Sequence, residues 1–132
     1  FAFNEQETLR RFVNAVVDER TMHEYYLAPF EYIIKTAKPY TVMSAYNKVN
    51  GHYASESQEL LIDILRNKWH YNGAVISDWG GVQDKVKSIK TGLNLEMPGN
   101  SEFNEHVKND PRTSQVLLTI RDGMLLIQKN EQ

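Results

Sequence analysis

The chain has 132 residues and a net charge of −2, and 41% of its residues are hydrophobic and 24% charged. These values are typical of one globular domain that is long enough to bury a hydrophobic core. Acidic and basic residues are mixed along the chain, which argues against a nucleic-acid-binding face or a membrane-binding surface. The absence of cysteine excludes disulfides and thiolate metal sites but leaves the compartment open.

The first twenty residues are polar and give no clear periodic pattern. Across residues 21–37 apolar side chains recur at helical spacing and predict one helix, in which Pro29 introduces a kink or removes one backbone hydrogen bond. Asp18 or Thr21 is suited to cap its start, and Thr21 with Glu24 has the spacing of a capping box.

A strand and a second helix are predicted next. Residues 41–46 indicate a strand, and residues 47–51 a turn. Ser55 and Gln58 form a second capping-box candidate. One helical face follows, made of Leu60, Leu61, Ile64, Leu65 and Trp69.

A short buried strand is predicted at residues 73–77, with β-branched side chains at its centre. A helix over residues 82–90 and a strand over residues 93–97 follow, and Pro98 with Gly99 ends the strand. Strand and helix thus alternate three times at the spacing of βα units, which predicts an α/β fold with a parallel sheet.

The tail has a helical pattern. Asp110 and Pro111 are suited to the cap and first position of a helix. Its predicted apolar face, which Gly123 weakens, consists of Val116, Leu117, Ile120, Met124 and Ile127.

Asp78 and Trp79 stand directly after the strand at residues 73–77 and before a glycine pair. A carboxylate at the carboxyl end of a parallel strand lies where α/β barrels place their catalytic groups. The alternative for Asp78 is a cap of the following helix, and the alternative for Trp79 is a core tryptophan.

The surrounding motifs favour a catalytic interpretation. Ser77-Asp78-Trp79 resembles the nucleophile motif of glycoside hydrolase family 3, the β-glucosidase-like retaining enzymes. Residues 38–51 resemble the family's KPxxVMxAYNxVNG segment, and residues 61–73 its LLxxILRxxWxxxG helix. Residues 92–99 resemble its GLDLEMPG strand, and residues 1–7 its KHFAxNxQE segment without the Lys-His pair. The match runs nearly unbroken from residue 1 to residue 99.

The resemblance implies a fold and a domain assignment. The three predicted strands are too few for an eight-stranded barrel. They are expected to be the last three βα units of a (β/α)8 barrel, so that residues 1–132 form part of the family's N-terminal barrel domain, with residues 100–132 matching poorly. The chain is therefore expected to be a piece of a larger enzyme.

The resemblance also implies site residues. Asp78 is the expected nucleophile. Tyr46, at the end of the neighbouring strand, is expected to hydrogen-bond this carboxylate, although from the sequence alone it also fits a packing aromatic. Met43 is expected to line the first sugar subsite, and the indole of Trp79 to face a sugar. Glu96 is expected to be buried and paired with Arg10 or Arg11.

No residue convincingly supplies the general acid/base, which most of the family takes from a domain after the barrel. The four histidines lack the spacing of a metal site, and no phosphate-binding loop is present, so no metal or cofactor is expected.

Two functions are consistent with these observations. The first is a segment of a retaining glycoside hydrolase that cleaves terminal non-reducing β-linked sugars and is inactive alone. The second is a non-catalytic carbohydrate-binding or scaffold fragment. In both, the expected partners are a carbohydrate and either the rest of the same protein or a second copy.

Overall fold

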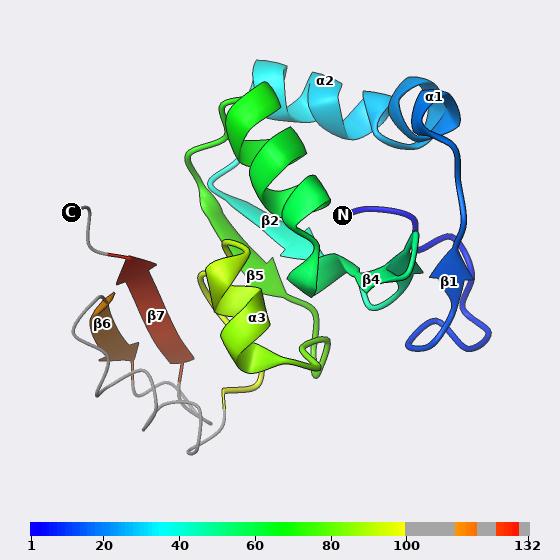
Figure 1. Ribbon diagram of the computed structural model, residues 1–132. Helices are drawn as coiled ribbons and strands as arrows, with labels where there is room; N and C mark the ends of the chain where they lie inside the picture. The colour runs from blue at the N-terminus through cyan, green and yellow to red at the C-terminus, as the bar shows by residue number, and fades with distance from the viewer. Residues whose placement is uncertain (100–112, 119–123, 130–132) are drawn as a thin grey trace.

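The computed structural model describes residues 1–99 in full, and after them the backbone of two strands at residues 113–118 and 124–129. Figure 1 shows an α/β arrangement in which the parallel strands β2 (Thr41–Ser44) and β5 (Ala74–Ser77) lie side by side. Their register pairs Thr41 with Ala74 and Ser44 with Ser77, so both strands end at the same edge. The predicted α/β class and parallel pairing are therefore present.

The chain start and the segment after the helix α3 (Lys85–Lys90) extend this pairing on either side. The Phe1 ammonium donates to the Met43 carbonyl at 2.8 Å, and the Ala45 N–H donates to the Phe1 carbonyl at 2.8 Å. On the far side, Leu95 forms a parallel bridge with Ile76. The spatial order is thus the Phe1 segment, β2, β5 and the Leu95 segment, and the sequence pattern missed the first of these.

The predicted strand at residues 93–97 is reduced to this single bridge. The Asn94 side-chain oxygen accepts the Val75 N–H at 2.8 Å, and the Ser77 hydroxyl oxygen accepts the Met97 N–H at 2.8 Å. Side chains therefore take the place of some backbone partners, and the regular ladder is interrupted on both sides of Leu95.

The prediction of one continuous helix at residues 21–37 is wrong. It consists of α1 (Glu19–Thr21), the wide turn η1 (Met22–Tyr26) and α2 (Ala28–Ala37). Pro29 lies in the first turn of α2, where a missing N–H removes no helical hydrogen bond. At the start, the Asp18 side chain accepts the Thr21 N–H at 3.0 Å, so Asp18 rather than Thr21 is the cap.

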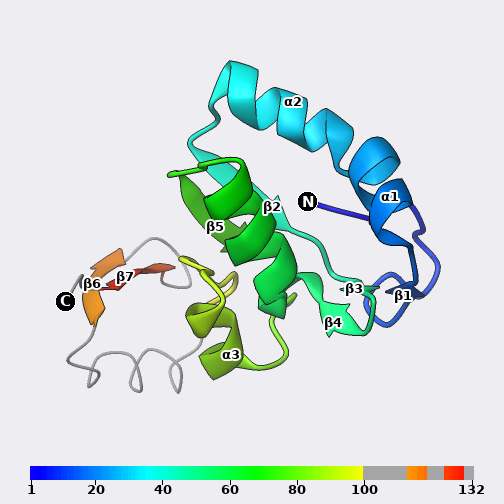
Figure 2. The same cartoon turned by 45° about the horizontal axis from the view of Figure 1, so that its top comes forward.

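The second predicted helix is η3 (Glu59–Lys68), which follows the short η2 (Ala54–Glu56). Its cap is Ser57, whose hydroxyl oxygen accepts the Leu60 N–H at 3.2 Å. The predicted cap, Ser55, instead donates its hydroxyl to the Gly81 carbonyl at 2.8 Å. Figure 2 shows η3 lying across β2 and β5, with α2 beyond it.

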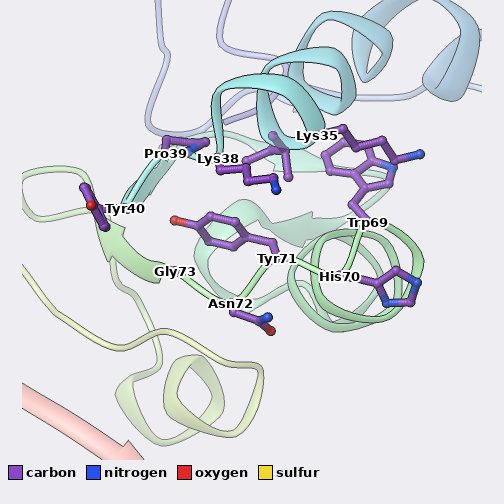
Figure 3. Close-up of a pocket in the computed structure, with 10 residues that line it drawn as sticks. Lys35, Lys38, Pro39, Tyr40, Trp69, His70, Tyr71, Asn72 and Gly73 are labelled. Atoms are coloured by element: carbon purple, nitrogen blue, oxygen red, sulfur yellow. The ribbon is translucent and has the colours of Figure 1, made fainter.

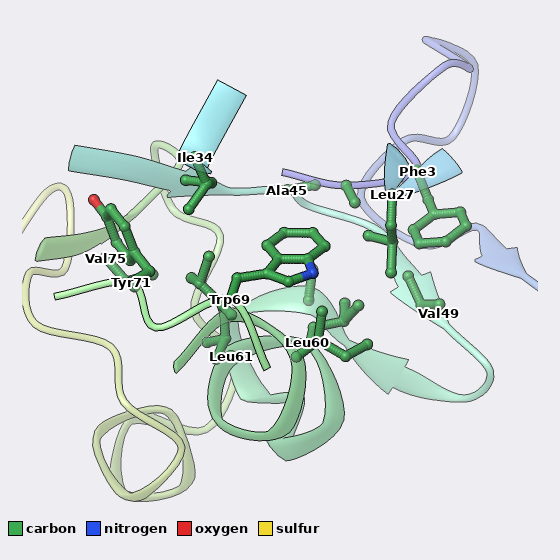
Figure 4. Packing of buried hydrophobic residues seen from close by; sticks show 14 of the residues in the cluster. Phe3, Leu27, Ile34, Ala45, Val49, Leu60, Leu61, Trp69, Tyr71 and Val75 are labelled. Atoms are coloured by element: carbon green, nitrogen blue, oxygen red, sulfur yellow. The ribbon is translucent and has the colours of Figure 1, made fainter. Parts of the chain in front are cut away.

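The buried face of η3 forms the centre of the core. Figure 4 shows the Trp69 indole between Leu60 and Ala45. Val75 of β5 is 0% exposed and packs into the same cluster. The other members include Ala2, Phe3, Met22, Leu27, Ile34, Val49, Ala54, Leu61, Ile64, Leu65, Tyr71 and Leu93.

A small second sheet forms where only a turn at residues 47–51 was predicted. Strands β3 (Lys48–Val49) and β4 (His52–Tyr53) are antiparallel, and β1 (Asn14–Ala15) pairs with β3 in parallel. The turn itself is Asn50-Gly51, with φ values of 48° and 90°. Two positive φ values match the tight hairpin turn that favours Asn-Gly.

The two remaining predictions need correction. The helix α3 (Lys85–Lys90) begins later than residue 82, because the Asp84 side chain caps it by accepting the Lys87 N–H at 2.9 Å. The predicted tail helix is wrong, because β6 (Thr113–Leu118) and β7 (Met124–Lys129) form an antiparallel pair.

Short apolar runs do not distinguish strand from helix by periodicity, and β-branched Thr113, Val116 and Ile127 favour strands. The other tail residues of the prediction, Asp110, Pro111, Ile120 and Gly123, lie outside the described residues.

None of the helices in the described part of the chain has the length and apolar content to span a bilayer.

Candidate active site

The candidate site lies at the edge where β2 and β5 end. Asp78 directly follows β5, and Tyr46 follows β2 by two residues. The shared register of the strands brings the two residues to the same edge. The Tyr46 side chain is buried, with 5% of its surface exposed, whereas Asp78 is partly exposed.

One backbone N–H donates to the Asp78 carboxylate, and one phenol lies close to it. The Trp79 N–H donates to its Oδ1 at 2.7 Å. The Tyr46 hydroxyl lies near the same side chain and donates to the Trp79 carbonyl at 2.9 Å.

The pKa of Tyr46 is raised above its ordinary value of 10.0. Burial is the main cause, and the hydrogen bond and negative charge of Asp78 add to it. The positive charges of Arg11 and Arg10 oppose the increase. The Tyr46 phenol is therefore neutral at ordinary pH and has a proton to donate.

Trp79 and Met43 both lie uncovered near this edge. The Trp79 side chain is 55% exposed and that of Met43 is 41% exposed. Met43 pairs in register with Ile76, on the face of β2 opposite the buried Ser44. All four predicted site residues are thus found on β2, β5 or the segments that directly follow them.

Two arginines that the sequence analysis did not assign to the site also lie here. The guanidinium carbons of Arg10 and Arg11 are each 4.9 Å from the centre of the Tyr46 ring. Arg11 also donates from Nη2 to the Trp79 carbonyl at 3.3 Å. Their position shortly after the Phe1 segment, which pairs with β2, is the signal that could have placed them.

Glu96 is buried as expected, but its predicted pairing with Arg10 or Arg11 is wrong. Its Oε1 lies 3.4 Å from the Lys85 Nζ, and the residue is 8% exposed. Burial raises the pKa of Glu96, while the Lys85 charge and hydrogen bond partly offset the increase. Lys85, the first residue of α3, reaches this carboxylate. The guanidinium groups of Arg10 and Arg11 instead lie over the Tyr46 ring.

A cavity of about 540 Å³ lies at the opposite edge of the sheet (Figure 3). Tyr40, which precedes β2, and Gly73, which precedes β5, both line it. It is therefore at the amino ends of the strands, away from Asp78. Its other lining residues are Ile34, Lys35, Lys38, Pro39, Trp69, His70, Tyr71 and Asn72.

Across residues 1–99, no three His, Cys, Asp or Glu side chains are grouped as a metal site would require. The chemistry available at the β2–β5 edge is therefore that of one carboxylate, one phenol, two guanidinium groups and an exposed indole.

Comparison with known proteins gives this arrangement a context. The family described as "Glycosyl hydrolase family 3 N terminal domain" matches residues 10–114. "Thermostable beta-glucosidase B" of Acetivibrio thermocellus is 52% identical over 98 residues, which are 74% of this chain and 13% of that protein. An "Exo-alpha-(1->6)-L-arabinopyranosidase" of Bifidobacterium longum is 39% identical over 125 residues, which are 95% of this chain and 15% of that protein.

A solved structure agrees. The crystal structure of a family 3 beta-glucosidase from Bifidobacterium adolescentis superposes with a TM-score of 0.79 at 45% identity, covering 82% of this chain and 16% of that one. The chain thus spans between 13% and 16% of the length of these relatives. The matched residues include the β2 and β5 strands and the segments that carry Asp78 and Tyr46. The chain belongs to glycosyl hydrolase family 3.

Proposed function

We propose that this chain is part of a retaining glycoside hydrolase of the β-glucosidase type, with Asp78 as its nucleophile. The observation that carries the proposal is the position of Asp78 directly after β5, where the Trp79 N–H donates to its carboxylate and the Tyr46 hydroxyl lies close by. Beta-glucosidases among the relatives give the reaction class.

In this proposal Asp78 attacks the anomeric carbon of a terminal non-reducing β-linked sugar. The sugar–oxygen bond to the leaving group breaks, and a glycosyl ester on Asp78 forms. Water later cleaves the ester and restores the carboxylate. The Trp79 N–H, 2.7 Å from Oδ1, holds one carboxylate oxygen, which leaves the other for attack.

The exposed side chains beside Asp78 are assigned to the sugar. The indole of Trp79, 55% exposed, offers an apolar face to the C–H surface of a pyranose ring. Met43, 41% exposed on the uncovered face of β2, lines the first subsite. Tyr46 donates to the nucleophile and contributes to stabilising its charge.

A retaining enzyme needs a second carboxyl group about 5–5.5 Å from the first. Within residues 1–99 the buried candidates are engaged elsewhere. Glu96 faces Lys85, and Glu56 accepts the Gln83 and Asp84 N–H groups at 3.1 Å and 2.7 Å. We therefore assign the general acid/base to a part of the protein outside residues 1–99, and the resemblance to the family favours a domain after the barrel.

The spatial order of the strands supports the proposed barrel assignment. The Phe1 segment, β2, β5 and the Leu95 segment lie next to one another in their order along the sequence, all in parallel. Consecutive strands of a (β/α)8 barrel have this order. We propose that residues 1–132 belong to an N-terminal barrel domain, of which they form the last βα units and the segment after them.

Membership of the family does not fix which sugar is cleaved, because its members differ in substrate. Curated relatives include both beta-glucosidases and an arabinopyranosidase. A β-glucoside is the first substrate to test, because the relative that is 52% identical to this chain is a beta-glucosidase.

A second candidate is a non-catalytic carbohydrate-binding or scaffold fragment. It is favoured by the lack of an assigned acid/base among the described residues. The two candidates differ in whether Asp78 ever forms a covalent bond to a sugar.

The experiment follows from that difference. The full-length protein containing this chain is incubated with an activated 2-deoxy-2-fluoro-β-glucoside, whose fluorine slows release of the sugar from the enzyme. Peptide mass spectrometry is expected to find the sugar on Asp78. Asp78→Asn should abolish labelling and turnover, whereas Asp63→Asn, the same change at an exposed position of η3, should preserve both.

Two results would overturn the proposal. One is full turnover by Asp78→Asn, and the other is a label on a different carboxylate. The isolated 132-residue chain is expected to show no turnover, because its general acid is absent. Turnover by that chain would make Glu96 and Glu5 the residues to test next.

A further inference from the structure

The carbonyl oxygen of Trp79 accepts two hydrogen bonds directly beside the proposed nucleophile. The Tyr46 hydroxyl donates to it at 2.9 Å, and the Arg11 Nη2 donates to it at 3.3 Å. These donors come from segments far apart in sequence, the turn after β2 and the turn after the Phe1 segment. They converge on the peptide that follows Asp78.

The Tyr46 hydroxyl has one proton and two acceptors within reach. A phenol donates a single hydrogen bond, and an ionised carboxylate only accepts. The Trp79 carbonyl takes the proton at 2.9 Å, and the Asp78 side chain lies near the same hydroxyl. Each acceptor also has another donor, Arg11 Nη2 for the carbonyl and the Trp79 N–H for the carboxylate, so either can release this proton to the other.

Arg11 is that other donor for the carbonyl. Its guanidinium lies over the Tyr46 ring, with 4.9 Å between the guanidinium carbon and the ring centre. From this position its Nη2 reaches the Trp79 carbonyl at 3.3 Å. A hydrogen bond from a charged donor is stronger than one from a neutral phenol, so the carbonyl remains satisfied when the Tyr46 proton turns away.

We propose that Arg11 is a positioning residue, which satisfies the Trp79 carbonyl and so frees the Tyr46 hydroxyl to donate to the Asp78 carboxylate. The inference rests on the proposed function, in which that carboxylate is the nucleophile. Arg11 acts through Tyr46 and does not itself take part in the chemistry.

Arg10 provides a matched comparison. Its guanidinium carbon is also 4.9 Å from the Tyr46 ring centre, so it places an equal charge at an equal distance. Its Nη1 instead lies 3.2 Å from the Glu7 carboxylate. Loss of charge near Tyr46 and loss of the donor to Trp79 can therefore be separated.

The first test is spectroscopic and does not depend on turnover. In full-length protein with ¹³C-labelled aspartate carboxyl groups, the infrared stretch of the Asp78 carboxylate is assigned by its loss in Asp78→Asn. Arg11→Met should move this band in the same direction and as far as Tyr46→Phe does. Arg11→Lys, which keeps a charged donor, should restore most of the wild-type position, and Arg10→Met should not reproduce the Tyr46→Phe spectrum.

The second test is a double-mutant cycle on kcat/KM for an aryl β-glucoside. Arg11→Met and Tyr46→Phe are each expected to lower kcat/KM by about tenfold, as for the loss of one hydrogen bond to a charged group. The double variant should lose no more than either single variant, because both remove the same hydrogen bond.

An unmoved Asp78 band in Arg11→Met would overturn the inference, as would a multiplicative loss in the double variant. So would an Arg10→Met band that matches Tyr46→Phe, since charge alone would then explain the effect. If the wild-type protein hydrolyses no glycoside, the proposed function fails, while the infrared comparison still decides whether Arg11 frees the proton.

Discussion

Two carboxylates show how the surroundings of individual residues divide their roles. Asp78 is partly exposed and accepts the Trp79 N–H at 2.7 Å. Glu96 is 8% exposed and faces the Lys85 ammonium at 3.4 Å. Burial raises the pKa of Glu96, whereas Asp78 remains in contact with solvent. Only the accessible carboxylate can approach a sugar.

Tyr46→Phe is expected to reduce kcat/KM of the full-length enzyme without changing its fold. The loss of one donor to a charged nucleophile should raise the barrier by about 1–3 kcal/mol. Steady-state kinetics on an aryl β-glucoside measure the effect. Tyr32→Phe, at a 70% exposed position of α2, is the control. Unchanged kinetics in Tyr46→Phe would show that the hydroxyl does not serve the reaction.

Glu96→Gln is expected to change how stability depends on pH. Because burial raises the pKa of folded Glu96 above its ordinary value of 4.5, the folded state holds this proton over a pH range in which the unfolded state has lost it. The contribution of Glu96 to the free energy of unfolding is therefore fully present below 4.5 and is lost as pH rises through the folded-state pKa.

The variant should remove this decline. Urea unfolding of the domain, followed at a series of pH values above 4.5, provides the measurement. Glu59→Gln, at an exposed position of η3, is the control for loss of a carboxylate. A decline of the same size in wild type and Glu96→Gln would assign it to another group.

At the scale of elements, η3 organises the described core. Its apolar face packs against β5, and Ser57 caps its start by accepting the Leu60 N–H at 3.2 Å. Since Ser57 is 4% exposed, water cannot readily replace this hydrogen bond.

Ser57→Ala should therefore lower the free energy of unfolding by about 1 kcal/mol, as for loss of a typical helix cap. Ser57→Thr keeps the hydroxyl and should retain most of the stability. Chemical denaturation of the full-length wild-type protein, Ser57→Ala and Ser57→Thr gives the comparison. Equal stability of Ser57→Ala and wild type would mean that the Leu60 N–H finds another acceptor.

At the scale of the whole molecule, the described residues 1–99 cover the central sheet on one face only. Ser44 and Val75 are buried at 1% and 0% exposure under the helices, whereas Met43 on the opposite face is 41% exposed. The chain also spans only 13% to 16% of its relatives' length. An uncovered sheet face and unpaired strand edges favour association with more protein.

The isolated 132-residue chain is accordingly expected to self-associate or to lack a cooperative melting transition. Sedimentation velocity over a range of concentrations, with thermal unfolding followed by circular dichroism, measures both properties. A compact monomer that melts cooperatively would contradict the expectation and would show that the uncovered face is tolerated.

Much of the architecture could be predicted because it depends on local patterns. The helical face around Leu60 and Ile64 and the parallel strands β2 and β5 follow from apolar spacing and β-branched residues. The tail was misread because two strands of six residues each, Thr113–Leu118 and Met124–Lys129, have apolar spacing that also fits a helix. Their pairing with each other decided the outcome.

The amino-acid sequence by itself determined the family motifs, the α/β pattern and the place of Asp78 at the end of a strand, because each depends on residues close together in the chain. Only the tertiary structure decided that the Phe1 segment pairs beside β2 and that Lys85 rather than an arginine faces Glu96. It also brought Arg11 to the Trp79 carbonyl, 68 residues away in sequence. Such contacts join distant segments, and their geometry is set by how helices and strands pack rather than by any local spacing.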